Sequence, residues 1–144
     1  MILSFYTIAY FLVDYLKQRG YHTIQVGAKD DFTVDNVDEF FFNRSFSDLV
    51  ALITVSKFFL GLDTFFQHLC GLMDKKGIVL TPAHNDHAFW PSIQYIVGTN
   101  GVEFEGMKWL KDHLNPHRKP CMDSITYEKV QGEVDKLISC FDKY

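Results

Sequence analysis

The segment from Val55 to Leu80 constrains the fold most strongly, because it predicts a strand, a helix and a second strand in immediate succession. An apolar run ends at Gly61-Leu62-Asp63-Thr64, a helix is expected over 64–73, and β-favouring residues return over 77–80. The strands of such a βαβ unit lie parallel in one sheet. The turn between strand and helix therefore belongs at the carboxyl edge of a sheet, where open α/β folds bind phosphorylated ligands.

Periodic apolar residues predict helices on both sides of this unit. The apolar stripe from Phe5 to Leu16 favours a helix over 4–19, which Gly20 ends. A capping box at Ser45–Asp48 begins a second helix over 46–56. A final helix is expected after Thr126, with apolar residues that recur up to Phe141. Strands are predicted at 23–26, 58–62, 77–80 and 92–97, and the segment 102–119 is left unassigned.

Strands and helices that alternate in this way indicate an α/β fold: a Rossmann-like, mainly parallel sheet with helices on both faces. The chain has 144 residues, 47% of them hydrophobic, and no linker divides 1–144 into separate domains. It begins on a helix, whereas a doubly wound domain usually begins on a strand at the sheet centre. The sequence therefore predicts a single domain that lacks its first strand.

The charge and the cysteine content indicate which classes of partner and which cellular compartment to expect. The net charge is −4 and no basic cluster occurs, so a nucleic-acid-binding surface is not expected. Cys70, Cys121 and Cys140 are odd in number and lack the spacing of a disulfide framework, which favours reduced thiols. The apolar opening to Val13 has no basic leader or cleavage site and is too short to span a bilayer. We expect a cytoplasmic protein without a transmembrane segment.

The strand-to-helix turn carries a specific pattern: Asp63, then Thr64, with His68 five positions after the aspartate. In this pattern the sequence resembles the heptosyltransferase-like glycosyltransferases, whose GT-B fold has two facing Rossmann-like domains. The resemblance is to the C-terminal, donor-binding domain, and it extends over most of residues 1–140. Phe65 departs from the family, which usually has glycine there. The flanking matches are Ser47-Asp48-Leu49, Lys76-Gly77-Ile78-Val79-Leu80, Cys121-Met122, Ile125, Glu128 and Val130.

The resemblance implies a nucleotide-diphospho-sugar as the ligand, with its diphosphate at the N-terminus of the 64–73 helix. Thr64 would offer a hydroxyl and an N–H group to phosphate, Asp63 would orient the sugar, and His68 would lie one turn along. Asp30, in the loop after the 23–26 strand, would lie near the ribose. The residues expected to bind the donor are Asp63, Thr64, Phe65, His68, Thr81 and Asp30, of which Thr81 follows only from its place at a strand's carboxyl end.

By the same resemblance, the enzyme would transfer the sugar with inversion, and neither a metal nor a cofactor would be required. An N-terminal acceptor domain, for which 144 residues leave no room, usually supplies the catalytic base. A partner chain could supply that domain instead. The alternative is a non-catalytic nucleotide-sugar-binding or interaction module, a degenerate or truncated glycosyltransferase. Phe65 favours this alternative, because a bulky side chain there could obstruct the approach of a diphosphate.

Simpler explanations are open for each predicted site residue. Asp63 and Thr64 are preferred N-cap residues, so either could do no more than begin a helix. His68 could have no role, and Asp30 could be an ordinary turn residue. The run Phe40-Phe41-Phe42 favours packing in a core or at a domain interface.

A zinc site is a further alternative. His84 and His87 have an H-x-x-H spacing, and His113, His117 and Cys121 follow one another at intervals of four. Neither group has the paired CxxC spacing that is typical of structural zinc sites. Solvated loop histidines are the simpler interpretation, and no metal site is predicted.

Overall fold

The computed structural model of the protein describes residues 5–81, 90–98 and 124–142. Its helices and strands follow one another as the sequence predicts, apart from an additional strand at 39–42 that comes after the strand at 24–27 with no helix between them, and every described pair of neighbouring strands is parallel. The elements are α1 (Phe5–Gln18), β1 (Ile24–Gly27), β2 (Glu39–Phe42), α2 (Phe46–Val55), β3 (Phe59–Leu62), α3 (Phe65–Leu72), β4 (Gly77–Thr81), β5 (Ile93–Val97) and α6 (Tyr127–Phe141). The α/β class and the parallel strands are confirmed.

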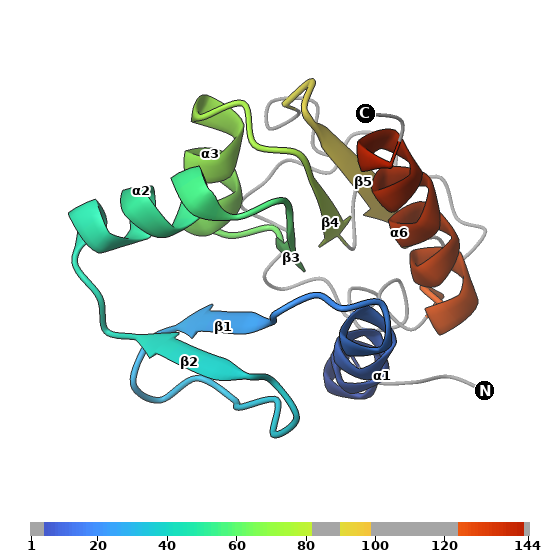
Figure 1. Ribbon diagram of the computed structural model, residues 1–144, viewed down its shortest axis with the longest axis horizontal. Coiled ribbons are helices and arrows are strands. Elements are labelled where there is room, and N and C mark those ends of the chain that lie inside the picture. The colour runs from blue at the N-terminus through green and yellow to red at the C-terminus, as the bar shows by residue number, and fades with distance from the viewer. Residues whose placement is uncertain (1–4, 82–89, 99–123, 143–144) are drawn as a thin grey trace, which may run out of the picture.

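The strands form two small sheets, whereas the sequence predicted one. In one sheet β1 pairs with β2, and in the other the order is β3-β4-β5. Figure 1 shows β1 as the strand of the first sheet that lies nearer to β3. Among the described residues, no strand pairs with the β3-facing edge of β1 or with the free edge of β3. The backbone groups along these two edges therefore take no part in a described ladder.

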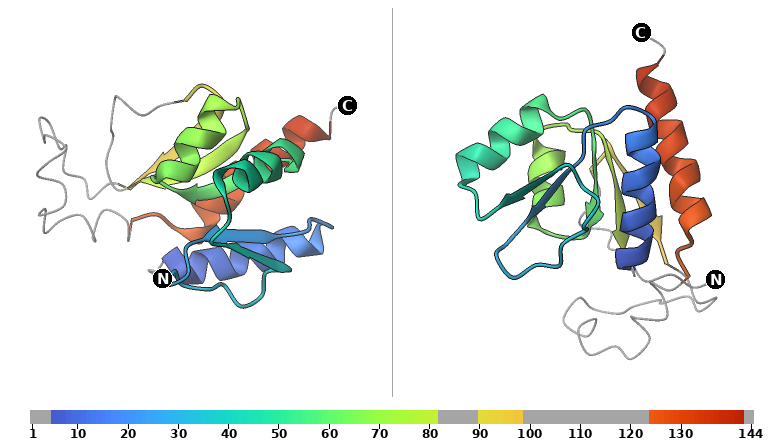
Figure 2. Two further views of the ribbon diagram at one scale, coloured as in Figure 1. Left: turned by 90° about the vertical axis from the view of Figure 1, so that its left-hand side faces the viewer. Right: turned by 60° about the horizontal axis from the view of Figure 1, so that its bottom comes forward.

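Helices cover both faces of the three-stranded sheet, as predicted for a Rossmann-like fold. On one face, Ile78 and Leu80 of β4 pack with buried residues of α1 and α6. On the other face, Val79 packs with Ile53 of α2 and with Leu69 and Cys70 of α3. Figures 1 and 2 show α1 and α6 together on one side of this sheet and α2 with α3 on the other. All residues of β4 are buried, as expected for a central parallel strand.

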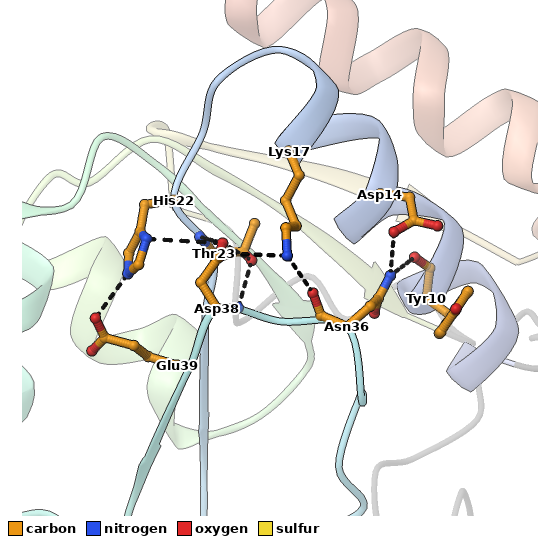
Figure 3. A network of polar contacts seen from close by, with 8 residues as sticks. All are labelled: Tyr10, Asp14, Lys17, His22, Thr23, Asn36, Asp38 and Glu39. Atoms are coloured by element: carbon orange, nitrogen blue, oxygen red, sulfur yellow. Dashed lines mark hydrogen bonds and ion pairs between the residues drawn. The ribbon is translucent and has the colours of Figure 1, made fainter.

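The β1–β2 sheet is attached to α1 by a polar network, which Figure 3 shows at close range. The Lys17 ammonium lies 2.9 Å from Asp38 Oδ1 and donates to the Asn36 carbonyl at 3.0 Å. The Asn36 amide donates to Asp14 Oδ1 at 2.7 Å and to the Tyr10 carbonyl at 2.9 Å. Side chains on α1 therefore hold the segment that leads into β2.

Asp38 is the centre of this network. Its Oδ2 accepts from the backbone N–H and from the hydroxyl of Thr23, both at 2.8 Å. The Thr23 N–H, the Lys17 ammonium and the Thr23 hydroxyl hold the pKa of the Asp38 carboxyl well below its usual range. The carboxylate therefore links the segment before β1, the start of β2 and α1.

Capping residues fix the ends of two helices where the sequence placed them. Ser45 Oγ accepts from the Asp48 N–H, and the Asp48 carboxylate accepts from the Ser45 N–H, which completes the capping box of α2. Thr126 caps α6 by accepting from the Lys129 N–H at 3.3 Å. Gly20, after α1, has φ +81°, a left-handed conformation that glycine adopts without strain.

The strand β2 was not predicted. Its apolar residues do not alternate with polar ones, and Phe40, expected in a core or at a domain interface, is 46% exposed. Phe40 and Phe42 contact each other edge to face on the two-stranded sheet. None of the helices in the described part of the chain has the length and apolar character needed to cross a membrane.

Candidate functional site

The candidate site lies at the carboxyl edge of the three-stranded sheet, where β3 leads into α3. Leu62, the last residue of β3, is in register with Leu80, the residue before Thr81 on β4. Asp63 and Thr64 follow Leu62, so the two predicted ligand contacts leave the sheet beside the end of β4. The fold therefore places the start of α3 and the end of β4 at one edge.

Thr64 occupies the N-cap position of α3, but its hydroxyl does not cap the helix. Its backbone is extended, with φ −140° and ψ 173°, and its side chain makes no capping hydrogen bond. The first turn of a helix has N–H groups without partners in the helix, and the helix dipole gives this end a partial positive charge. The exposed hydroxyl and these N–H groups are the kind of donors that bind an anion.

Asp63 does not cap the helix either, because its carboxylate contacts a side chain one turn later. The Gln67 amide donates to Asp63 Oδ1. Gln67 is only 1% exposed, and its own carbonyl Oε1 is buried without a partner. The buried Gln67 amide therefore holds Asp63 at the edge of the sheet. The hydrogen bonds do not support the interpretation that Asp63 or Thr64 merely caps α3.

His68 faces Trp90, which precedes β5 and packs on the same face of the sheet as α3. The indole N–H of Trp90 donates to His68 Nδ1 at 3.2 Å, and the two rings meet edge to face. The backbone N–H of Trp90 donates in turn to the Tyr95 hydroxyl at 3.2 Å. Burial raises the pKa of Tyr95, and the nearby Asp63 carboxylate raises it further, whereas the Trp90 N–H lowers it.

These contacts join residues that the sequence did not group. Gln67, Trp90 and Tyr95 were not predicted as part of the site. Trp90 and His68 are 22 residues apart in sequence, and no local periodicity predicts a contact between them. The spacing of Asp63 and Gln67, four apart across the start of α3, is a signal that could have been used.

Phe65 is exposed at the first position of α3. It is 62% exposed, and its ring lies 6.4 Å from the ring of Phe46 at the start of α2. The Phe65 side chain therefore leans toward the neighbouring helix. Both rings stand at helix starts that follow the carboxyl ends of strands, Phe46 after β2 and Phe65 after β3.

Thr81 and Asp30 occupy different surroundings. Thr81 is only 5% exposed, and its carbonyl accepts from the Gly98 N–H at 2.9 Å. Asp30 is exposed in the turn after β1, next to Asp31, whose carboxylate accepts from the Ala28 N–H at 2.6 Å. No described contact joins Asp30 to the residues around α3, so the structure groups Asp63, Thr64 and Thr81 more closely than it does Asp30.

The residues considered for zinc, His84, His87, His113, His117 and Cys121, lie outside the described residues. Within the described ranges, no three histidine, cysteine or acidic side chains gather in a way that could hold a metal ion. Cys70 and Cys140 are free thiols. Comparison of the chain with protein-family models, with curated proteins and with solved structures gives no match.

Proposed function

We propose that this chain is the donor-binding domain of an inverting glycosyltransferase and binds a nucleotide-diphospho-sugar at the N-terminus of α3. The observation that carries the proposal is the strand order. A doubly wound sheet has the order 3-2-1-4-5-6, and β2-β1 followed by β3-β4-β5 matches this order, with no strand of the described residues at position 1 between β1 and β3 (Figure 1). Ligands of such sheets bind beyond the carboxyl ends of the strands beside that position, and Asp63 and Thr64 follow β3 directly.

The chemistry of the site supports an anionic leaving group. The start of α3 offers backbone N–H groups and the free Thr64 hydroxyl to a diphosphate. A carboxylate repels phosphate, so Asp63 suits the hydroxyls of the transferred sugar. In the reaction, an acceptor oxygen attacks the anomeric carbon, the bond to the diphosphate breaks, and the nucleoside diphosphate leaves with the electron pair.

The acceptor proton goes to a base outside the residues named here. An acceptor domain or a partner chain would supply this base, and we expect the complete enzyme to work in the cytoplasm. The absence of a described strand between β1 and β3 supports the idea that this domain works with a further strand.

A non-catalytic nucleotide-sugar-binding module is the second candidate. Phe65 favours it, since an exposed aromatic ring at the first position of α3 stands where a diphosphate would approach. Such a module would bind the nucleotide-sugar without releasing nucleoside diphosphate.

Calorimetric titration with UDP-glucose, GDP-mannose and ADP-glucose tests the proposal. We expect one of them to bind, and we expect Asp63→Ala and Thr64→Val each to weaken that binding by about tenfold, as for loss of a hydrogen bond to a charged group. Asp142→Asn, at the end of α6, is the matched control and should leave binding unchanged. Absence of binding to all three at millimolar concentration would overturn the proposal.

A second measurement separates the two candidates. Release of nucleoside diphosphate from the bound nucleotide-sugar, followed over hours, indicates a transferase that retains its chemistry. Binding without release favours the non-catalytic module when a sugar acceptor and the domain or partner chain that supplies the base are also present.

A further inference from the structure

The contacts of Trp90 with α3 point to a positioning role for this residue. We propose that Trp90 holds His68 as the tautomer with its proton on Nε2, so that His68 presents a fixed N–H donor to the ligand. The tautomer follows from contacts within the protein, and only the ligand part rests on the function proposed above.

The hydrogen bond between the two rings sets the tautomer. An indole N–H can only donate, so His68 Nδ1, 3.2 Å away, must carry the lone pair that accepts. A neutral imidazole with a lone pair on Nδ1 carries its proton on Nε2. The ring nitrogen that does not face Trp90 is therefore a hydrogen-bond donor.

The backbone of α3 makes room for the indole at Gly71. A Cβ atom at this position would overlap several atoms of the Trp90 ring. Gly71 and His68 lie three apart on one face of α3, so the indole crosses the helix at the glycine and reaches the histidine one turn away. A larger side chain at position 71 would displace the ring from His68.

The main chain of Trp90 is held as well. Its N–H donates to the Tyr95 hydroxyl, and its carbonyl accepts from the Ile93 N–H at 3.0 Å. Tyr95 lies on β5, whose register with β4 is fixed by backbone pairing. The indole is therefore positioned from the sheet and from α3 together, which gives His68 one orientation.

The orientation matters for binding of the nucleotide-sugar. His68 is the fourth residue of α3, and Thr64, the N-cap, comes four residues before it. A fixed Nε2–H beside the helix N-terminus adds a directional donor to the backbone N–H groups there. A donor that is fixed before the ligand arrives loses less conformational entropy on binding.

Nitrogen-15 NMR of the histidine side chains in the ligand-free protein is the first test. We expect the His68 signals to show protonated Nε2 and unprotonated Nδ1, and the Trp90 indole proton to resonate downfield of the indole proton of tryptophan in water. His68→Ala should remove the downfield shift of Trp90. A His68 with its proton on Nδ1 would overturn the inference, whatever the ligand titrations show.

Two glycine variants form a matched pair for the second test. Gly71→Ala should displace the indole and abolish the His68–Trp90 signature, while Gly132→Ala on α6, where an added Cβ meets no atom within 4 Å, should leave it unchanged. Trp90→Phe keeps an aromatic ring but removes the indole N–H. This variant tests the hydrogen bond to His68 if Gly71→Ala does not fold. An unchanged His68 spectrum in Trp90→Phe would overturn the positioning role.

Titration of Trp90→Phe with the same three nucleotide-sugars completes the test. We expect binding to weaken by about five- to tenfold, which corresponds to a lost hydrogen bond of ordinary strength. If the NMR signature is present and no nucleotide-sugar binds to the unmodified protein, the proposed function fails while the tautomer assignment stands. If a nucleotide-sugar binds equally well to Trp90→Phe, the presentation of His68 to the ligand is wrong.

Discussion

The two sheets of this protein are stabilised in different ways. The β3–β4–β5 sheet lies between helices on both faces, and Ile78, Val79 and Leu80 of β4 are all buried. Every residue of β1 is partly exposed, and the β1–β2 sheet depends on Lys17, Asp38 and their neighbours for its attachment to α1. Parallel strands are usually buried on both faces, and only the β3–β4–β5 sheet meets that condition.

The difference shows what a parallel sheet needs. β4 has a hydrogen-bonded strand on each side, whereas β1 has one described partner. Apolar burial follows from central position, since a central strand can be covered from both faces. We expect the β3–β4–β5 sheet to respond to changes in side-chain volume and the β1–β2 sheet to changes in charge and pH.

Equivalent substitutions in the two sheets should give the largest contrast. Ile78→Ala on β4 should lower the free energy of unfolding by about 3 kcal/mol, because it leaves a cavity in a core where Ile78 is 1% exposed. Ile24→Ala on partly exposed β1 should cost about 1 kcal/mol or less. Urea unfolding followed by circular dichroism measures both. Equal losses would contradict the distinction between the sheets.

The N-caps of α2 and α3 should differ by a smaller amount. Ser45→Ala breaks the capping box of α2 and should lower the free energy of unfolding by about 1 kcal/mol. Thr64→Ala at the N-cap of α3 should change it by less than about 0.5 kcal/mol, because the Thr64 hydroxyl caps nothing. Thermal and urea unfolding of the two variants provide the comparison. A loss in Thr64→Ala as large as that in Ser45→Ala would make Thr64 a structural residue.

The attachment of the β1–β2 sheet should weaken in acid. Because the folded state lowers the pKa of Asp38, the unfolded state binds a proton first, and the stabilisation present above about pH 4 is lost as the pH falls toward the folded pKa. Hydrogen exchange of the β1 and β2 amides should therefore quicken in acid, relative to the intrinsic exchange rate, before that of the β4 amides. Asp38→Asn should show the weaker protection already at neutral pH. Identical acid profiles for β1 and β4 would contradict the expectation.

An exposed ion pair gives the smallest expected effect. Lys136 Nζ lies 2.7 Å from Glu133 Oε1 on the surface of α6, one turn away. Lys136→Ala should change the free energy of unfolding by about 0.3 kcal/mol, and 0.5 M salt should remove even that difference. Urea unfolding at low and high salt measures it. A change above about 1 kcal/mol would mean that surface charges stabilise α6 as they do the β1–β2 sheet.

Much of the fold could be predicted from local sequence signals. The capping box at Ser45, the cap at Thr126 and the apolar stripe after Phe5 each place a helix within a residue or two of its bounds. The expectation of one sheet was incomplete, because strand pairing depends on residues far apart in sequence. The strand at 39–42 was missed for the same reason, since its pairing with β1 is set by the segment between them and by Asp38.

The candidate site was predicted only in part. Asp63 and Thr64 were identified because a strand-to-helix turn signals the carboxyl edge of a sheet, and His68 was identified from its place five positions after Asp63 in a family pattern. The partners that determine what these residues can do, Gln67 and Trp90, were not identified. Packing buries Gln67 and leaves its carbonyl without a partner. Packing also places the indole of Trp90 against Gly71. Both contacts depend on the whole fold and not on local sequence.

Cys70 gives α3 a chemical reporter of its own motion. The thiol is fully buried against the sheet two residues after His68, and burial raises the pKa of Cys70 to about 12. Almost none of it is thiolate at neutral pH, so an alkylating reagent should modify Cys70 only during moments when α3 lifts from β3 and β4. Exposed Cys140 would react at once. The labelling rate of Cys70 therefore measures how often the helix that carries Thr64 and His68 leaves the sheet.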